Sequence, residues 1–262
     1  MKTKLIEFKN KDKNILRGIV VLPKKINQGV IMIGGFEGNA TTEKKYKVLS
    51  DELYKFNIAS FRIDYTGCGL SDGDFSKITI KKVTQDLLMT YRLFKNEFGI
   101  NNISVAGHSM GCCAIANLEK NNIFKKMILL APALNQKKLL RYWYVKNSMK
   151  YLNSKIKITW KNYKKYLNEK EFQKFCLKKD RMTDKNYVSD IYYLENKSQD
   201  YLAIMDAKNI FIINGNDDDV VPIESLENKK KIDVIVKNGD HDLERPDMVN
   251  QWKNKAIKFL IG

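Results

Sequence analysis

The chain is organised around Ile103-Ser104-Val105-Ala106-Gly107-His108-Ser109-Met110-Gly111. An apolar, β-prone run leads into Gly-x-Ser-x-Gly, and the small residues 112–116 follow, so the stretch predicts a strand, a sharp turn and a helix. The serine at the apex of such a turn has a strained backbone and a hydroxyl that stands clear of the sheet. A Cβ at Gly107 or Gly111 would collide with a neighbouring strand or helix. The pattern is typical of a nucleophile elbow, provided that later strands supply an acid and a base.

Apolar strands alternate with amphipathic helices on both sides of this stretch. The expected strands are 5–9, 16–22, 29–33, 58–65, 103–106, 127–131, 209–214 and 232–236, and the expected helices include 42–56, 79–98 and 247–260. The first two strands alternate as an antiparallel pair does, whereas the later ones are continuous apolar runs of the buried, parallel kind. The sequence therefore predicts an α/β fold with a mostly parallel, doubly wound sheet.

Residues 134–206 break this alternation. They carry 17 Lys and Arg against 8 Asp and Glu, and 13 of the 28 aromatic residues. Because a run of this length is too long for an ordinary loop, we expect an inserted lid or cap subdomain at 134–206 on a core formed by 1–133 and 207–262. The insertion should cover Ser109 and supply most of a pocket beside it. The alternative is a helical decoration that takes no part in the site.

Composition excludes several classes of protein. The net charge is +17, but six arginines accompany 41 lysines, and recognition of phosphate and bases favours Arg, so we expect no nucleic-acid partner. No apolar run approaches the roughly 20 residues that cross a bilayer, and no signal-like segment opens the chain, which predicts no membrane span and a cytoplasmic protein. The four cysteines lack metal-ligand spacing and are expected to be reduced thiols.

The base and the acid can be sought by elimination and chain order. Of the two histidines, His108 lies inside the elbow with its side chain expected to point away from the serine hydroxyl, so His241 is the candidate base. Residues 217–219 are three aspartates on a loop that follows the expected strand 209–214, and each is a candidate acid. The order Ser, Asp, His is the order that this kind of fold requires.

With these residues in place, the chain resembles the α/β-hydrolases, specifically the cinnamoyl (feruloyl) esterase-like branch of bacterial serine hydrolases. The resemblance covers about residues 15–133 and 208–260. The matching stretches are Gly35-Phe36-Glu37-Gly38-Asn39, 58–64, Gly67-Cys68-Gly69-Leu70-Ser71-Asp72-Gly73, 107–111, 215–222 and Gly239-Asp240-His241.

The resemblance implies a role for individual residues. In the family's Gly-x-x-Asp-x-x-Val-Pro pattern the aspartate aligns with Asp218, which makes Asp218 the implied acid. The implied oxyanion donors are the backbone N–H groups of Phe36 and Met110. The chain departs from the family at Gly34-Gly35, where His-Gly is usual; because the donor is a backbone group, we expect catalysis to survive, and the stiffness of the loop is left open.

The function implied is a serine carboxylesterase that cleaves a small-molecule acyl ester through an acyl-enzyme, with no metal or organic cofactor. An acyl-thioester hydrolase or acyltransferase and a monoacylglycerol-type lipase would share every catalytic residue. A non-catalytic binding protein that has kept the fold is a further alternative, against which the complete Ser109, Asp218 and His241 argue. The acyl group, the leaving group and the oligomeric state are not indicated by the sequence.

Overall fold

Eight strands form one sheet in the computed structural model of the chain, which describes residues 2–153, 155–179, 181–183 and 185–262. The strands are β1 (Lys2–Lys9), β2 (Ile15–Leu22), β3 (Gln28–Ile33), β4 (Ile58–Asp64), β5 (Ile103–His108), β6 (Met127–Leu130), β9 (Ile210–Gly215) and β10 (Val234–Val236). Their order across the sheet is β1-β2-β4-β3-β5-β6-β9-β10. The pairs β1–β2 and β2–β4 are antiparallel and the others are parallel. The sequence predicted the antiparallel β1–β2 pair and the parallel later strands, but not the antiparallel β2–β4 pair.

The register of the central strands brings two loops together. Ile33 at the end of β3 pairs with Gly107 at the end of β5, so the loop that follows β3 lies beside the turn at Ser109. Both strands are buried along almost their whole length, since their apolar side chains face helices on both sides of the sheet. The parallel arrangement thus places the carboxyl ends of β3 and β5 at one edge, where ligands bind in open α/β sheets.

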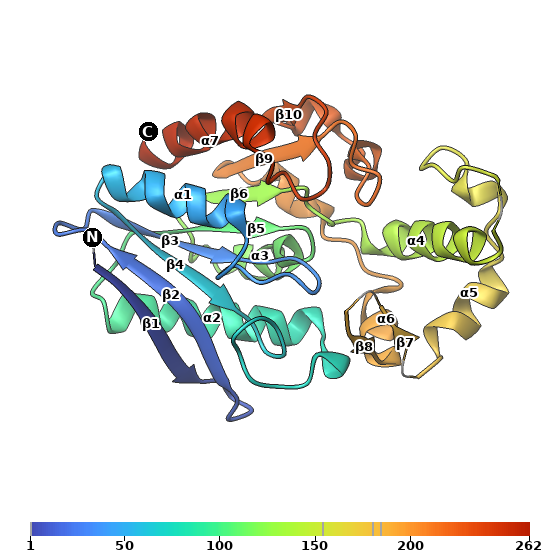
Figure 1. Cartoon of the computed structure of the whole chain (residues 1–262), viewed down its shortest axis with the longest axis horizontal. Helices are drawn as coiled ribbons and strands as arrows, with labels where there is room; N and C mark the ends of the chain where they lie inside the picture. The colour runs from blue at the N-terminus through green and yellow to red at the C-terminus, as the bar shows by residue number, and fades with distance from the viewer. Residues whose placement is uncertain (1, 154, 180, 184) are drawn as a thin grey trace.

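Helices cover both faces of the sheet (Figure 1). On one face α1 (Lys44–Lys55) and α7 (Pro246–Ile261) share a buried apolar cluster, to which Tyr46 and Trp252 contribute. On the other face α2 (Ile80–Asn96) and α3 (Gly111–Glu119) pack against a second cluster. The doubly wound architecture is that of the α/β-hydrolase fold.

Element boundaries differ from the expected ones by one or two residues in several places. Helix α1 begins at Lys44 instead of residue 42, and β10 begins at Val234 instead of residue 232. The helix that follows Pro222 is a short 3₁₀ turn, η4 (Ile223–Leu226). The remaining 3₁₀ turns are η1 (Phe75–Lys77), η2 (Tyr163–Lys165), η3 (Leu202–Asp206) and η5 (Lys229–Lys231). The ends of an element are harder to predict from sequence than its existence, because the terminal turns depend on local hydrogen bonds.

The segment between β6 and β9 consists of helices and one short hairpin at the end of the sheet where β6 and β9 finish (Figure 1). Its elements are α4 (Gln136–Tyr151), α5 (Glu169–Cys176), β7 (Arg181–Met182), β8 (Tyr187–Val188) and α6 (Asp190–Asn196). The sequence showed no strand here, because β7 and β8 are two residues each and too short for a period to be recognised. Phe172 and Tyr192 of this segment join the buried cluster that also contains β5 side chains.

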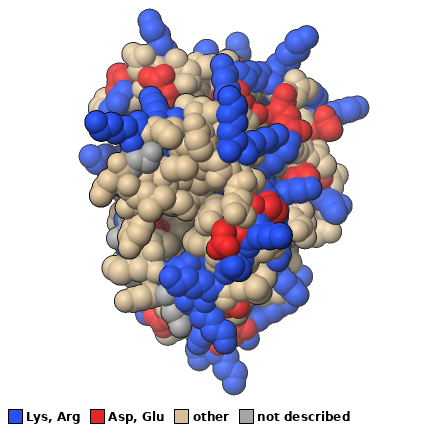
Figure 2. Space-filling model, turned by 90° about the vertical axis from the view of Figure 1, so that its right-hand side faces the viewer, with Lys and Arg blue, Asp and Glu red and all other residues tan. Residues whose placement is uncertain are grey.

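The surface of this end of the molecule carries many cations (Figure 2). Lys and Arg side chains project from the top, right and bottom of the face shown, and an uncharged area lies to the left. Across the described ranges, no helix is long and apolar enough to cross a membrane. All four cysteines are buried free thiols, and burial raises the pKa of Cys68 to about 12.

Candidate active site

The turn between β5 and α3 has the strained backbone that the sequence predicted. Ser109 has φ +51, in the left-handed region that a non-glycine residue occupies at a cost of roughly 1–3 kcal/mol. The Ser109 N–H donates to the Leu130 carbonyl of β6 at 2.9 Å, which fixes the turn to the neighbouring strand. A Cβ at Gly111 would lie 2.5 Å from the carbonyl oxygen of Gly34, so the two loops approach more closely than an alanine would allow.

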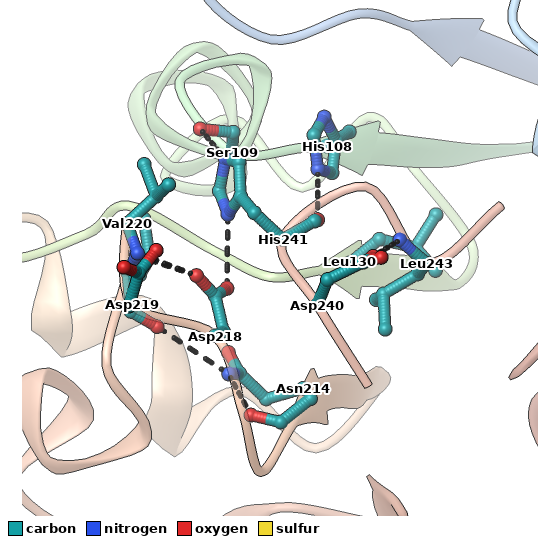
Figure 3. A network of polar contacts seen from close by, with 12 residues as sticks. His108, Ser109, Leu130, Asn214, Asp218, Asp219, Val220, Asp240, His241 and Leu243 are labelled. Atoms are coloured by element: carbon teal, nitrogen blue, oxygen red, sulfur yellow. Dashed lines mark hydrogen bonds and ion pairs between the residues drawn. The ribbon is translucent and has the colours of Figure 1, made fainter. Parts of the chain in front are cut away.

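Three side chains from distant parts of the chain meet at this turn (Figure 3). His241 Nε2 lies 3.0 Å from Ser109 Oγ, and His241 Nδ1 lies 2.9 Å from Asp218 Oδ2. Since the carboxylate can only accept, Nδ1 carries the proton and Nε2 is free to accept the serine hydroxyl. The Asp218 side chain is fully buried and that of His241 is 17% exposed, so the imidazole faces the solvent side of the group.

The three neighbouring aspartates have different partners. Asp218 Oδ1 accepts the backbone N–H groups of Val220 and Val221 at 2.9 and 2.8 Å, which leaves Oδ2 for His241. Asp219 instead accepts from the Lys146 ammonium of α4 at 2.8 Å, and the side chain of Asp217 is exposed. Asp218 is therefore the aspartate that the structure brings to His241.

The loop after β3 lies against the turn at Ser109. A Cβ at Gly35 would be 2.9 Å from Ser109 Cβ, so the residue before Phe36 packs directly against the serine. Two hydrogen bonds stiffen this loop where the usual histidine is absent: the Tyr65 hydroxyl and the Gly38 N–H donate to the Gly35 carbonyl at 2.7 and 3.0 Å. Within the described ranges, no protein group accepts the N–H of Phe36 or of Met110. Both donors thus remain available to a substrate oxygen.

The segment between β6 and β9 also holds this loop. Glu37 has φ +57, and its carboxylate accepts hydrogen bonds from the Thr183 hydroxyl and, at 3.1 Å, from the Asn186 amide. The ring of Phe36 lies 5.0 Å from the ring of Tyr192 of α6. Contacts to the hairpin and to α6 therefore reach Phe36 and Glu37, the two residues that follow Gly35.

The sequence placed His108 away from the serine hydroxyl but missed its contact with the other histidine. His108 Nε2 lies 2.8 Å from the backbone oxygen of His241, and the centroids of the two rings are 4.8 Å apart. No sequence pattern could have found this pair, because 133 residues separate the two positions.

A cavity of about 360 Å³ opens onto Ser109 and His241. Its charged lining residues are Glu37, Glu43, Lys44, Lys45, Lys185, Asp242 and Glu244. The Lys45 ammonium is buried between the carboxylates of Glu43 and Glu244, at 2.8 and 3.1 Å, and burial raises the pKa of Glu43. The cavity walls beside the serine are therefore polar and charged.

This lining differs from the expected one. Among described residues, Lys185 is the cavity's one lining residue from 134–206, whereas the insertion was expected to form most of the pocket. Several aromatic residues of the insertion pack instead against one another, as Tyr142 does with Trp160 and Tyr163 at 5.5 and 5.7 Å. Burying these rings in clusters satisfies their apolar surface without a ligand.

In the described part of the chain, no group of three or more His, Cys, Asp and Glu side chains is arranged to hold a metal ion.

Comparison with known proteins gives a family and a fold. The family model described as Hydrolase_4, serine aminopeptidase S33, matches residues 27–231. No curated protein matches the sequence significantly. Among solved structures, Est1E from Butyrivibrio proteoclasticus with ferulic acid bound has a TM-score of 0.75 at 19% identity, covering 98% of this chain and 100% of that one.

Two further structures are similar over nearly the whole chain. The α/β hydrolase GrgF from Penicillium sp. sh18 has a TM-score of 0.70 at 17% identity, with 99% of this chain and 98% of that one covered. The Pyrococcus furiosus esterase PF2001 has a TM-score of 0.69 at 19% identity, with 99% and 91% covered. At these identities the likeness establishes the α/β-hydrolase fold.

Proposed function

The chain belongs to the Hydrolase_4 family of serine aminopeptidase S33-like hydrolases, and on that premise we propose that it hydrolyses carboxylic esters through an acyl-enzyme on Ser109. In this proposal His241 is the general base and Asp218 is the acid that orients it. The observation that carries the proposal is the continuous line of hydrogen bonds from Ser109 through His241 to the buried Asp218, at 3.0 and 2.9 Å.

The chemistry follows from the positions of the protons. Ser109 Oγ attacks the acyl carbonyl carbon while its proton passes to His241 Nε2, which has no proton of its own. The imidazolium that forms is stabilised by the Asp218 carboxylate through Nδ1–H. Two N–H groups of Asp218's own loop hold the carboxylate in place, so it cannot turn away as the charge on the imidazole changes.

The negative charge that develops on the carbonyl oxygen requires donors. We assign these to the N–H groups of Phe36 and Met110, each worth roughly 3–4 kcal/mol of barrier when well aligned. His241 then returns the proton to the leaving alcohol oxygen as the acyl-enzyme forms. A water that gives its proton to the same Nε2 hydrolyses the acyl-enzyme and releases the carboxylic acid.

The charged lining of the cavity restricts the kinds of acyl group that fit beside Ser109. Placing an alkyl chain or an unsubstituted ring against the exposed charges of Lys44, Lys185 and Asp242 would desolvate them without compensation, so a small polar substituent beside the reacting carbon fits better. A ferulic-acid-type acyl group, as bound by Est1E, would have to lie elsewhere. The family's aminopeptidase description supports a second candidate, cleavage of an aminoacyl amide at the same serine.

The role of residues 134–206 is also a proposal. We assign them to an inserted cap on the core formed by 1–133 and 207–262. The contacts of Thr183, Asn186 and Tyr192 with the loop at Glu37 support a cap that braces the oxyanion loop more than one that walls an acyl pocket.

A labelling and turnover experiment tests the proposal. The purified chain should react with a fluorophosphonate probe at one residue, and Ser109→Ala should abolish labelling while leaving the melting temperature close to that of the wild type. A panel of p-nitrophenyl acetate, butyrate and octanoate, methyl ferulate, acetyl-CoA and alanine p-nitroanilide then separates ester, thioester and amide activity. Labelling that persists in Ser109→Ala would refute the assignment, and a preference for octanoate would refute the polar pocket.

A further inference from the structure

His108 connects the strand that carries the nucleophile to the loop that carries the base. It is the last residue of β5, and its ring extends from there to the backbone of His241, with Nε2 2.8 Å from the carbonyl oxygen (Figure 3). A carbonyl oxygen only accepts, so His108 Nε2 carries the proton and donates it. The bond is enclosed, since His108 is 5% exposed.

The surroundings of His108 keep it neutral. Burial lowers the pKa of His108 well below its usual range, and the Lys45 ammonium and the His241 ring lower it further. Lys45 is in turn held by Glu43 from the β3–α1 loop and by Glu244 from the His241 loop. A neutral imidazole has one N–H, and here that N–H is committed to His241.

The hydrogen bond from His108 and the two contacts that take part in the proposed chemistry reach different parts of His241. Asp218 and Ser109 contact the ring, whereas His108 contacts the main chain of the same residue. A ring held at its nitrogens can still change its distance to Ser109 if its backbone shifts. Fixing the carbonyl removes that freedom, because β5 is a central, fully buried strand.

We propose that His108 is a positioning residue whose Nε2–H fixes the backbone of His241, so that the imidazole of His241 meets Ser109 and Asp218 together. The inference rests on the proposed function, in which that imidazole is the base. His108 itself takes no proton from the substrate. A shift of the base by about 1 Å can reduce a rate by about 10²-fold, and this is the loss expected without the bond.

Three substitutions at His108 separate positioning from folding. His108→Gln can present an amide N–H near the place of Nε2, His108→Asn carries a shorter donor that falls short of it, and His108→Leu has similar volume and no donor. On the best ester of the panel, kcat should fall by about 10²-fold in the Leu and Asn variants at nearly constant KM, and the Gln variant should recover most of it.

The matched control is Thr90→Val, which also removes a buried hydrogen bond but lies away from Ser109 and His241. Thr90→Val removes a buried hydrogen bond to the Asp86 carbonyl inside α2, so its melting temperature should fall while kcat per folded molecule stays unchanged. If kcat in folded His108→Leu or His108→Asn equals that of the wild type, the proposal is overturned.

Imidazole NMR decides the question even if no ester is turned over. The chain has two histidines, so each ring can be assigned by substitution. His108 should be the neutral Nε2–H tautomer, and the far-downfield Nδ1–H signal of His241 bonded to Asp218 should persist in His108→Gln and broaden or vanish in His108→Leu and His108→Asn. An Nδ1–H tautomer at His108, or an unchanged His241 signal in the Leu and Asn variants, would overturn the proposal. An inactive wild type with the expected spectra would overturn the proposed function alone.

Discussion

Replacing Asp218 by asparagine isolates the electrostatic and tautomeric role of one carboxylate. The side chain makes three hydrogen bonds, to the N–H groups of Val220 and Val221 through Oδ1 and to His241 through Oδ2. An asparagine can keep the first two with its carbonyl oxygen, so the loop should stay folded. Its amide nitrogen then faces His241 Nδ1 and can only donate, which forces the imidazole proton onto Nε2.

The size of the effect follows from that tautomer. With a proton on Nε2 the imidazole cannot accept the hydroxyl proton of Ser109, and the stabilisation of the imidazolium is also lost. We expect kcat to fall on the order of 10⁴-fold, which corresponds to about 5.4 kcal/mol of barrier. KM should change little, because the Asp218 carboxylate acts through His241 and does not itself bind the substrate.

Asp217→Asn and Asp219→Asn are the matched controls for this measurement. Asp219 has a largely exposed side chain and pairs with Lys146, a kind of contact worth roughly 0–1 kcal/mol. Both control variants should keep kcat/KM for p-nitrophenyl acetate within about threefold of the wild type, because an exposed charge contributes little free energy to the structure. A larger loss in either control than in Asp218→Asn would refute the reasoning, and so would a folded Asp218→Asn of wild-type activity.

Three further expectations test other parts of the site. Gly35→Ala should lower kcat by about 10²-fold without unfolding the chain, measured by steady-state kinetics and thermal melting, because its Cβ would lie 2.9 Å from Ser109 Cβ. If the hydrogen bond from Thr183 to Glu37 holds the oxyanion loop in place, Thr183→Val should lower kcat by about tenfold and change KM less. A variant with the kcat and KM of the wild type would contradict this role. His108 should contribute a fall in the unfolding free energy as pH drops below about 6.5, since the unfolded chain then takes up a proton at His108 that the folded chain, with its lowered pKa, does not. His108→Gln should flatten this dependence in urea titrations at pH 7 and pH 5.5, and an unchanged slope would count against a buried neutral ring.

The sequence predicted the elements because their signals are local. The expected strand at 103–106 and the turn at Ser109 follow from apolar residues and small residues within one short stretch, and the structure has the turn there and a strand that runs two residues further, to His108. The chain order Ser, Asp, His could likewise be recognised from the sequence alone. The choice of Asp218 among three adjacent aspartates came from a family pattern, and the structure places that side chain at His241.

What the sequence could not predict depends on which distant surfaces meet. The abundance of rings in 134–206 suggested a lining for an acyl group, but rings also bury one another, and composition does not distinguish the two. The charged cavity arises because Glu43, just before α1, and Lys45, in the first turn of α1, face Glu244 of a loop that comes almost 200 residues later. No spacing rule relates such positions.

The position of the proposed nucleophile in the chain also matters during synthesis. The elbow precedes His241 by 132 residues, a stretch that a ribosome takes roughly 7–26 s to add at about 5–20 residues per second. Until β9 and β10 have emerged and joined the sheet next to β6, the serine has neither acid nor base. A growing chain whose first strands are already paired would therefore expose a hydroxyl of ordinary reactivity. On the proposed assignment, translation itself delays the chemistry until the last edge of the sheet is added.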